Sequence, residues 1–197
     1  MKKNLLFVAI AFLFASCAKK PEACVEPSAS KVSVGQEITF KNCSQNADKS
    51  NVDYGDDKTE KGVGATFTHI YTLPGTYNVK LTATTDKDKE DEVSTTITVK
   101  DIEKAEVLGS WNLYKSNMSL MGWFFGTSDF TPENIDYVFA SDSVTITENT
   151  YSPQKEKWSL STKGVLTIGY NTYQIQKLYD NEMIWDDGEY VYYLTKK

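Results

Sequence analysis

The sequence predicts an all-β protein of two successive domains, an antiparallel β-sandwich and a small antiparallel meander β-barrel. After residue 20, apolar and polar residues alternate with a period of two, as in Tyr77, Val79 and Leu81. This alternation is typical of half-buried strands. Clusters of Gly, Pro, Asp and Asn separate the short runs, as they do in antiparallel all-β folds.

The first seventeen residues have the order of a bacterial secretory signal. Lys2 and Lys3 form a positive start, residues 5–14 form an apolar run, and small residues lead to Cys17. The apolar run is about half of the ~20 residues that a transmembrane helix needs. We therefore expect residues 1–16 to be a signal peptide that is removed.

The sequence Phe14-Ala15-Ser16-Cys17 resembles the lipobox of bacterial lipoproteins, whose cysteine is acylated and becomes the new N-terminus. The resemblance implies lipidation of Cys17, a tether over residues 17–20, and membrane binding through acyl chains worth about 0.8 kcal/mol per buried CH₂. By the sorting rule of these proteins, Ala18 implies the outer membrane, with either face possible. The alternative is an ordinary signal peptide cleaved at Ala15-Ser16.

Charge and cysteine content fit an exported protein that does not bind nucleic acid. The formal charge is −6, and few basic clusters are present, which argues against nucleic-acid binding. Exported proteins form disulfides in an oxidising compartment, so we expect Cys24 and Cys43 to pair. A loop of about twenty residues corresponds to around 3 kcal/mol of stabilisation, whereas two free thiols would be unusual.

Three motifs in residues 21–100 resemble those of PKD domains, which are immunoglobulin-like modules. They are Val34-Gly35-Gln36-Glu37-Ile38-Thr39-Phe40 with Asn42-Cys43-Ser44, Val52-Asp53-Tyr54-Gly55-Asp56-Asp57, and His69-Ile70-Tyr71 with Pro74-Gly75-Thr76-Tyr77-Asn78-Val79-Lys80-Leu81. The resemblance implies a β-sandwich. Val52 and Asp57 depart from the usual tryptophan and glycine, and both changes concern packing and turn shape.

The acidic turn of this domain is a weak candidate for a calcium site. Asp53, Asp56 and Asp57 place three hard oxygen ligands in one turn, which suits calcium. Such acids more often cap backbone N–H groups, so we favour a structural role and expect no other cofactor. His69, the single histidine, is expected to make a hydrogen bond within a turn.

After a short linker at residues 101–106, the sequence predicts a barrel over residues 107–197. Asp187-Gly188 is a strong hairpin signal, and Lys163-Gly164 and Tyr170-Asn171 are weaker ones. Consecutive hairpins form a meander, and a meander of about eight strands removes its exposed edges by closing into a barrel.

The barrel segment is similar to small lipocalin-like domains of bacterial lipoproteins. Leu108-Gly109-Ser110-Trp111-Asn112-Leu113 is similar to their Gly-x-Trp opening strand, and Trp158-Ser159-Leu160 with Leu166-Thr167-Ile168 and Tyr173-Gln174-Ile175 is similar to their middle strands. The resemblance implies a barrel that can hold a small hydrophobic ligand. The segment is much shorter than an animal lipocalin, so a roomy cavity does not follow.

Aromatic and apolar side chains are the candidates for ligand or partner contact. A run at residues 120–126 lies between the first two expected barrel strands, where it forms either a lid or docking patch or a plug that completes the core. The barrel aromatics either line a cavity or fill the core. The candidate residues are Trp111, Met121, Trp123, Phe124, Phe125, Tyr170, Tyr173 and Trp185.

The residues give no support for an enzyme. No Gly-x-Ser-x-Gly, His-Glu-x-x-His or phosphate-binding glycine loop is present, and the neighbours Asp186 and Asp187 would point to opposite faces of a strand. We expect a non-enzymatic binding module of the cell envelope that holds a small apolar ligand or a protein partner. The alternative is a structural accessory subunit of an outer-membrane protein complex.

Overall fold

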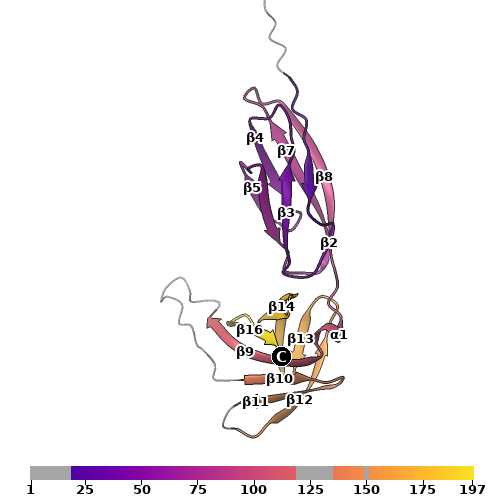
Figure 1. Ribbon diagram of the computed structural model, residues 1–197, viewed down its shortest axis with the longest axis vertical. Helices are drawn as coiled ribbons and strands as arrows, with labels where there is room; N and C mark the ends of the chain where they lie inside the picture. The colour runs from indigo at the N-terminus through magenta and orange to yellow at the C-terminus, as the bar shows by residue number, and fades with distance from the viewer. Residues whose placement is uncertain (1–18, 119–134, 149–150) are drawn as a thin grey trace, which may run out of the picture.

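The computed structural model describes residues 19–118, 135–148 and 151–197. They form two β domains joined by a short linker (Figure 1). Within these residues, no helix has the length and apolarity needed to cross a membrane. The predicted all-β class is confirmed, with a sandwich followed by a closed barrel.

The N-terminal domain is a sandwich of two sheets. One sheet contains β1 (Val25–Pro27), β3 (Glu37–Asn42) and β6 (Thr66–Ile70) in the order β1-β3-β6. The other has the order β2-β8-β7-β4-β5, with β2 (Lys31–Val32), β8 (Glu90–Val99), β7 (Gly75–Thr84), β4 (Lys49–Asp53) and β5 (Thr59–Lys61). All pairs are antiparallel except β2 with β8, which is parallel.

The alternating residues of these strands build the sandwich core. Ile38 and Phe40 of β3 face Val79 and Leu81 of β7, and all four side chains are fully buried. Each buried side chain of this size contributes about 1.5–3 kcal/mol. The predicted disulfide between Cys24 and Cys43 is confirmed, and the N–H of Cys43 also donates to the carbonyl of Cys24 at 3.0 Å.

The C-terminal domain is a closed barrel of eight antiparallel strands, as predicted. The strands are β9 (Gly109–Met118), β10 (Ile135–Phe139), β11 (Ser143–Glu148), β12 (Gln154–Leu160), β13 (Val165–Ile168), β14 (Asn171–Tyr179), β15 (Glu182–Asp186) and β16 (Tyr190–Lys196). Each strand pairs with the next, and β16 pairs with β9 to close the ring. Closure leaves no free edge along the meander.

The two ends of the barrel differ in the segments that connect the strands there. The chain enters β9 through α1 (Lys104–Val107), whose Val107 side chain is fully buried, and we call this the helix end. At the other end, tight turns join β13 to β14 and β15 to β16. We call this end the rim.

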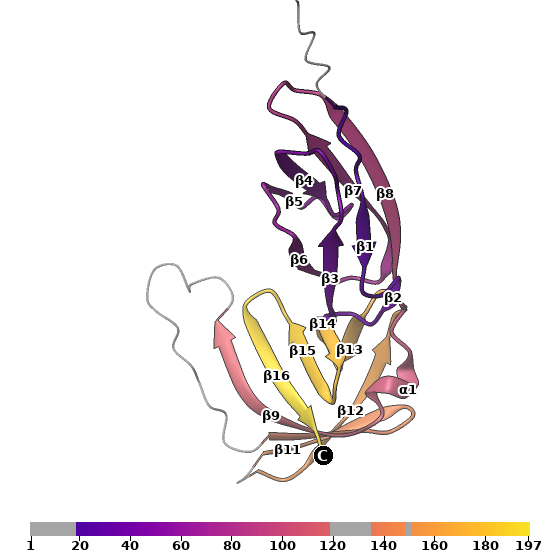
Figure 2. The ribbon, with the colours of Figure 1, turned by 45° about the horizontal axis from the view of Figure 1, so that its top comes forward.

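The linker and the sandwich pack directly on the barrel (Figure 2). The N–H of Leu178 in β14 donates to the carbonyl of Val34 in the sandwich at 3.2 Å. Gly35 has a φ of +77°, and a Cβ atom on it would lie 2.6 Å from the Cβ of Lys177. Ile102, in the predicted linker, is buried, and its Cδ1 lies against Gly164. The linker is therefore part of the packed interior at this junction.

Candidate functional site

Two barrel tryptophans pack with their indole N–H groups satisfied. Trp111 Nε1 donates to the carbonyl of Val107 at 2.7 Å, and Trp158 Nε1 donates to the carbonyl of Ala140, also at 2.7 Å. The ammonium group of Lys104 lies 4.5 Å from the Trp158 ring centre. These contacts fix both indoles at the helix end, which fits a structural role.

A second group of aromatic rings surrounds Trp185 nearer the rim. The Trp185 ring centre lies 5.3 Å from those of Tyr137 and Tyr173 and 6.4 Å from that of Tyr192. We call Tyr137, Tyr173, Trp185 and Tyr192 the rim cluster. The four residues come from β10, β14, β15 and β16, so only the closed barrel brings them together.

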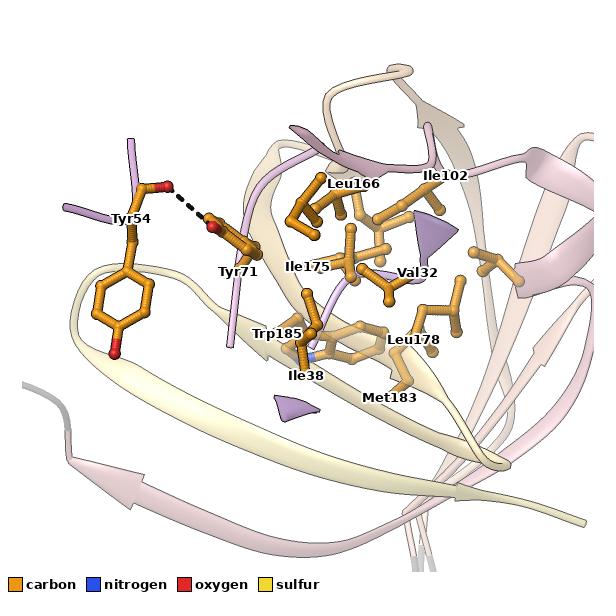
Figure 3. Close-up of a cluster of buried hydrophobic side chains, with 14 of the residues drawn as sticks. Val32, Ile38, Tyr54, Tyr71, Ile102, Leu166, Ile175, Leu178, Met183 and Trp185 are labelled. Carbon is orange, nitrogen blue, oxygen red and sulfur yellow. Dashed lines mark hydrogen bonds between the residues drawn. The ribbon is translucent and has the colours of Figure 1, made fainter. Parts of the chain in front are cut away.

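The indole N–H of Trp185 has no hydrogen-bond acceptor among the described residues, although the side chain is only 1% exposed. Figure 3 shows the nitrogen edge of the ring turned towards the β15–β16 turn and the six-membered ring towards Leu178. A buried donor without a partner costs about 1–3 kcal/mol. Native proteins rarely keep such a group without a reason.

Asp187 holds the β15–β16 turn at the edge of the rim cluster. Its Oδ1 accepts from the N–H groups of Tyr190 at 2.7 Å and Glu189 at 2.9 Å, and its Oδ2 accepts from the Tyr192 hydroxyl at 2.9 Å. Burial raises the pKa of Asp187, but these three hydrogen bonds outweigh it and the net pKa is lowered. Asp187 is therefore a fixed, ionised acceptor beside the aromatic rings.

Burial is the main reason that the pKa values of Tyr137, Tyr173 and Tyr192 are raised. For Tyr192 the hydrogen bond to Asp187 raises the pKa further. The three phenols are therefore neutral at physiological pH, and each offers a ring face and a polar hydroxyl group.

A surface depression of about 350 Å³ lies beside the rim cluster. Its walls include Tyr173 and Asp187, which connects it to the cluster. The full lining is Val165, Thr172, Tyr173, Gln174, Asp186, Asp187 and Gly188. A second depression, about 510 Å³ in volume, lies over β11 and β12 and is lined by Asp142, Ser143, Lys155, Glu156 and Lys157.

The structure brings Tyr173 and Trp185 together, as two of the predicted candidates, and places Trp111 in the core below them. The position of Tyr170 differs from the predicted one, in which its side chain would line the barrel. It lies in the β13–β14 turn and is fully exposed, because Gly169 with a φ of +58° starts the turn one residue before the expected hairpin. Cys17, Met121, Trp123, Phe124 and Phe125 lie outside the described residues.

The acids of the sandwich turn act on its own backbone and on His69. Asp53 Oδ1 accepts from the N–H of Gly55 at 2.9 Å, and Asp56 Oδ1 accepts from that of Lys58 at 3.3 Å. Asp56 Oδ2 lies 2.9 Å from His69 Nε2. Among the described residues, the set of three possible metal ligands within 4.8 Å of one another is Cys24, Glu26 and Cys43, and it does not include the aspartates. Because the two cysteines of that set form the disulfide, they offer no thiolate.

Sequence reasoning missed Tyr137 and Gln174, and it missed that Asp187 of the predicted turn lies beside the barrel aromatics. The alternation of Ile135, Tyr137 and Phe139 marks Tyr137 as an inward residue and could have identified it. No local pattern shows that Gln174 and Asp187 line one depression, because Gln174 lies in β14 and Asp187 in the β15–β16 turn, and only the pairing of β14 with β15 brings them together.

Residues 18–100 match the PKD domain family. This part of the chain is therefore a PKD domain. The predicted resemblance is thereby confirmed for the sandwich, whereas the lipoprotein and lipocalin-like resemblances stay predictions.

Several solved structures are similar to parts of this chain. The PKD1 domain of the Vibrio cholerae metalloprotease PrtV is 30% identical, covering 41% of this chain and 98% of that domain with a TM-score of 0.35. The PKD1 domain of Vibrio anguillarum Epp is 24% identical over 42% of this chain and 95% of its own, with a TM-score of 0.35. A structure described as a carbohydrate-binding module of the β-sandwich superfamily is 15% identical over 91% and 93%, with a TM-score of 0.41. The comparison with curated proteins gave no match.

Proposed function

We propose that this protein is a lipid-anchored, non-enzymatic binding module of the bacterial cell envelope, and that it binds at the rim of its barrel. A PKD domain next to a β-barrel supports a binding or accessory role. The observation that carries the proposal is the buried indole N–H of Trp185, which has no acceptor among the described residues. An acceptor from a bound molecule would remove the cost of leaving this donor unpaired.

The rim cluster is suited to binding because its aromatic rings gather at one end of the barrel, beside the Asp187 carboxylate. Tyr173 and Asp187 belong both to this region and to the adjoining depression. Small-molecule sites commonly combine apolar and aromatic walls with a few fixed polar groups. The Asp187 carboxylate, held by three hydrogen bonds, is such a fixed group.

The PKD domain would act as a spacer between membrane and barrel. The described chain enters the sandwich at the end farthest from the barrel (Figure 1). There Lys20 bonds to Asp91 Oδ1 at 3.0 Å, and the N–H of Ala23 donates to Asp91 Oδ2 at 2.9 Å. An acyl group on Cys17 would therefore hold the far end of the sandwich and leave the barrel away from the bilayer.

The second candidate is an accessory subunit of an outer-membrane complex, and the packing of the barrel favours it. Leu166, Ile175, Met183 and Leu194 are fully buried and fill the interior below the rim cluster. Such a filled interior favours docking of a partner at the rim over enclosure of an apolar ligand. The two functions share the same surface and differ in what occupies it.

Mass spectrometry of the protein purified from native envelope tests the anchor. We expect a chain that begins at Cys17 and carries acyl groups, and a Cys17→Ser variant that is released from the membrane fraction. An unmodified Cys17 in the native protein would contradict the anchoring proposal.

Indole N–H resonances in NMR spectra test the binding surface. We expect the Trp185 signal to differ between protein isolated with its native partner and the same protein after refolding alone. Trp185→Phe assigns the signal, and Trp111 is the matched control because its N–H already donates to Val107. Identical Trp185 signals in both preparations would count against binding at the rim.

A further inference from the structure

We propose that the ligand at the rim is a neutral sugar ring of a glycan, held in the depression beside the rim cluster. This inference rests on the proposed binding function and specifies its ligand. The depression of about 350 Å³ lies at the lower end of the range for small-molecule sites, about 300–1,000 Å³. This size suits the end of an oligosaccharide.

The lining of the depression supplies the groups that recognise hydroxyls. Thr172 offers a hydroxyl group, Gln174 an amide, and Asp186 and Asp187 carboxylates. A sugar ring has hydroxyl groups around its edge and C–H groups on its faces. Its hydroxyls can donate to the carboxylates and the amide oxygen.

The amide of Gln174 has a fixed orientation. Its Nε2 lies 3.1 Å from the carbonyl oxygen of Lys163, 3.3 Å from that of Gly164 and 3.1 Å from that of Ile175. All three neighbours are acceptors, so the nitrogen must face them and Oε1 must face away. Oε1 is therefore the atom of this amide that is left to accept a hydrogen bond from a ligand.

The two carboxylates are also held in place by the chain itself. Asp186 Oδ1 accepts from the N–H of Gly188 at 2.7 Å, and its Oδ2 accepts from Gln176 Nε2 at 2.9 Å. Asp187 is fixed by the turn and by Tyr192. Acceptors fixed in this way lose little entropy when a ligand binds, which favours binding of a polar molecule.

The same lining disfavours other classes of ligand. Lys and Arg are absent from it, whereas two aspartates are present, so an anion would be repelled. Four of the seven residues carry polar or charged side chains besides Tyr173, so a purely apolar chain would remove these groups from water without offering them new hydrogen bonds.

Calorimetric and NMR titrations of the full mature chain test the inference. The probes are the neutral hexasaccharides of cellulose, xylan, mannan and starch, with palmitate, spermidine and citrate as apolar, cationic and anionic controls. We expect at least one neutral hexasaccharide to bind and to shift the side-chain amide signal of Gln174. Binding of the intact polysaccharide alone, without its hexasaccharide, would place the site along a polymer and would contradict recognition of a single ring end.

Variants locate the binding site. Thr172→Val and Asp186→Asn should each weaken sugar binding by about tenfold. Asp142→Asn, in the depression over β11 and β12, should leave it unchanged. Sugar binding that survives both of the first two variants would overturn the inference, as would binding of palmitate, spermidine or citrate in place of sugars. Palmitate binding that shifts the Trp185 N–H signal would overturn the sugar inference but support the proposed function. Identical Trp185 signals in the native and refolded preparations would instead contradict the proposed function itself.

Discussion

The two domains use aromatic residues in different ways. In the PKD domain, the polar tips of the central rings are paired within the fold: the Tyr71 hydroxyl donates to the Tyr54 carbonyl at 2.8 Å, and the Tyr54 hydroxyl donates to Glu60 at 2.8 Å. His69 stacks on Tyr54 with ring centres 3.8 Å apart and bonds to Asp56. In the barrel, Trp111 and Trp158 are paired in the same way, whereas Trp185 has no acceptor among the residues that the structure describes.

This difference separates packing from binding. A ring whose polar group is satisfied inside the fold already has the partner that it needs, so its position is explained by stability. A buried donor without a partner lowers stability unless another molecule supplies the acceptor. The contrast indicates a structural role for the PKD aromatics and supports the binding role that we propose for the rim cluster.

The largest expected loss of stability comes from removing the disulfide of the PKD domain, and it tests whether the two domains unfold separately. The Cys24→Ala/Cys43→Ala double variant should destabilise the sandwich by about 3 kcal/mol, because the unfolded chain is no longer restricted by the loop that the disulfide closes. All four tryptophans lie after residue 107, so tryptophan fluorescence follows the barrel while circular dichroism follows both domains. A midpoint shift of the same size in both signals would show that the domains unfold as one unit.

Gly35 tests the contact between the domains. Gly35→Ala should cost about 2 kcal/mol more than Gly62→Ala, because both glycines have a positive φ but only Gly35 faces Lys177 closely. Small-angle scattering should show a more extended particle for Gly35→Ala, and denaturation should give the difference in free energy. Equal costs for the two variants would contradict the close packing at this junction.

A pair of tryptophan variants tests the contrast within the barrel. Trp111→Phe leaves the carbonyl of Val107 without its donor, whereas Trp185→Phe removes a donor that has no described partner. Urea denaturation should therefore show a loss for Trp111→Phe that is greater by about 1–2 kcal/mol. An equal or greater loss for Trp185→Phe would mean that its N–H already has a partner in the isolated protein.

The smallest expected change in stability at neutral pH comes from the buried tyrosine hydroxyl groups of the PKD domain. Burial raises the pKa of Tyr54 and Tyr71 above the ordinary value near 10. The fold favours the neutral phenol, so this stabilisation is complete below about pH 10 and is lost as the pH rises through the raised pKa. Denaturation midpoints should fall above pH 10, and they should fall less steeply in Tyr71→Phe; identical slopes would contradict the assignment.

Local sequence determined most of the fold. The alternation of Ile38 with Phe40 and of Val79 with Leu81 sets which side of each strand is buried, and Asp187-Gly188 sets one hairpin turn. These features act over two to four residues, so they can be read without the rest of the chain. The pairing of Cys24 with Cys43 was predicted from the expected export to an oxidising compartment and from the presence of two cysteines after Cys17.

Only the tertiary structure decided the site and the junction. The rim cluster joins four strands, and the depression joins Gln174 with Asp186 across a pairing that the sequence does not encode locally. The lack of an acceptor for Trp185 within the described ranges and the contact of Gly35 with Lys177 are properties of groups far apart in the chain. The sequence could determine which residues turn inwards, because that depends on neighbours. Which inward groups lack a partner depends on every strand around them, so it appears only when the barrel closes.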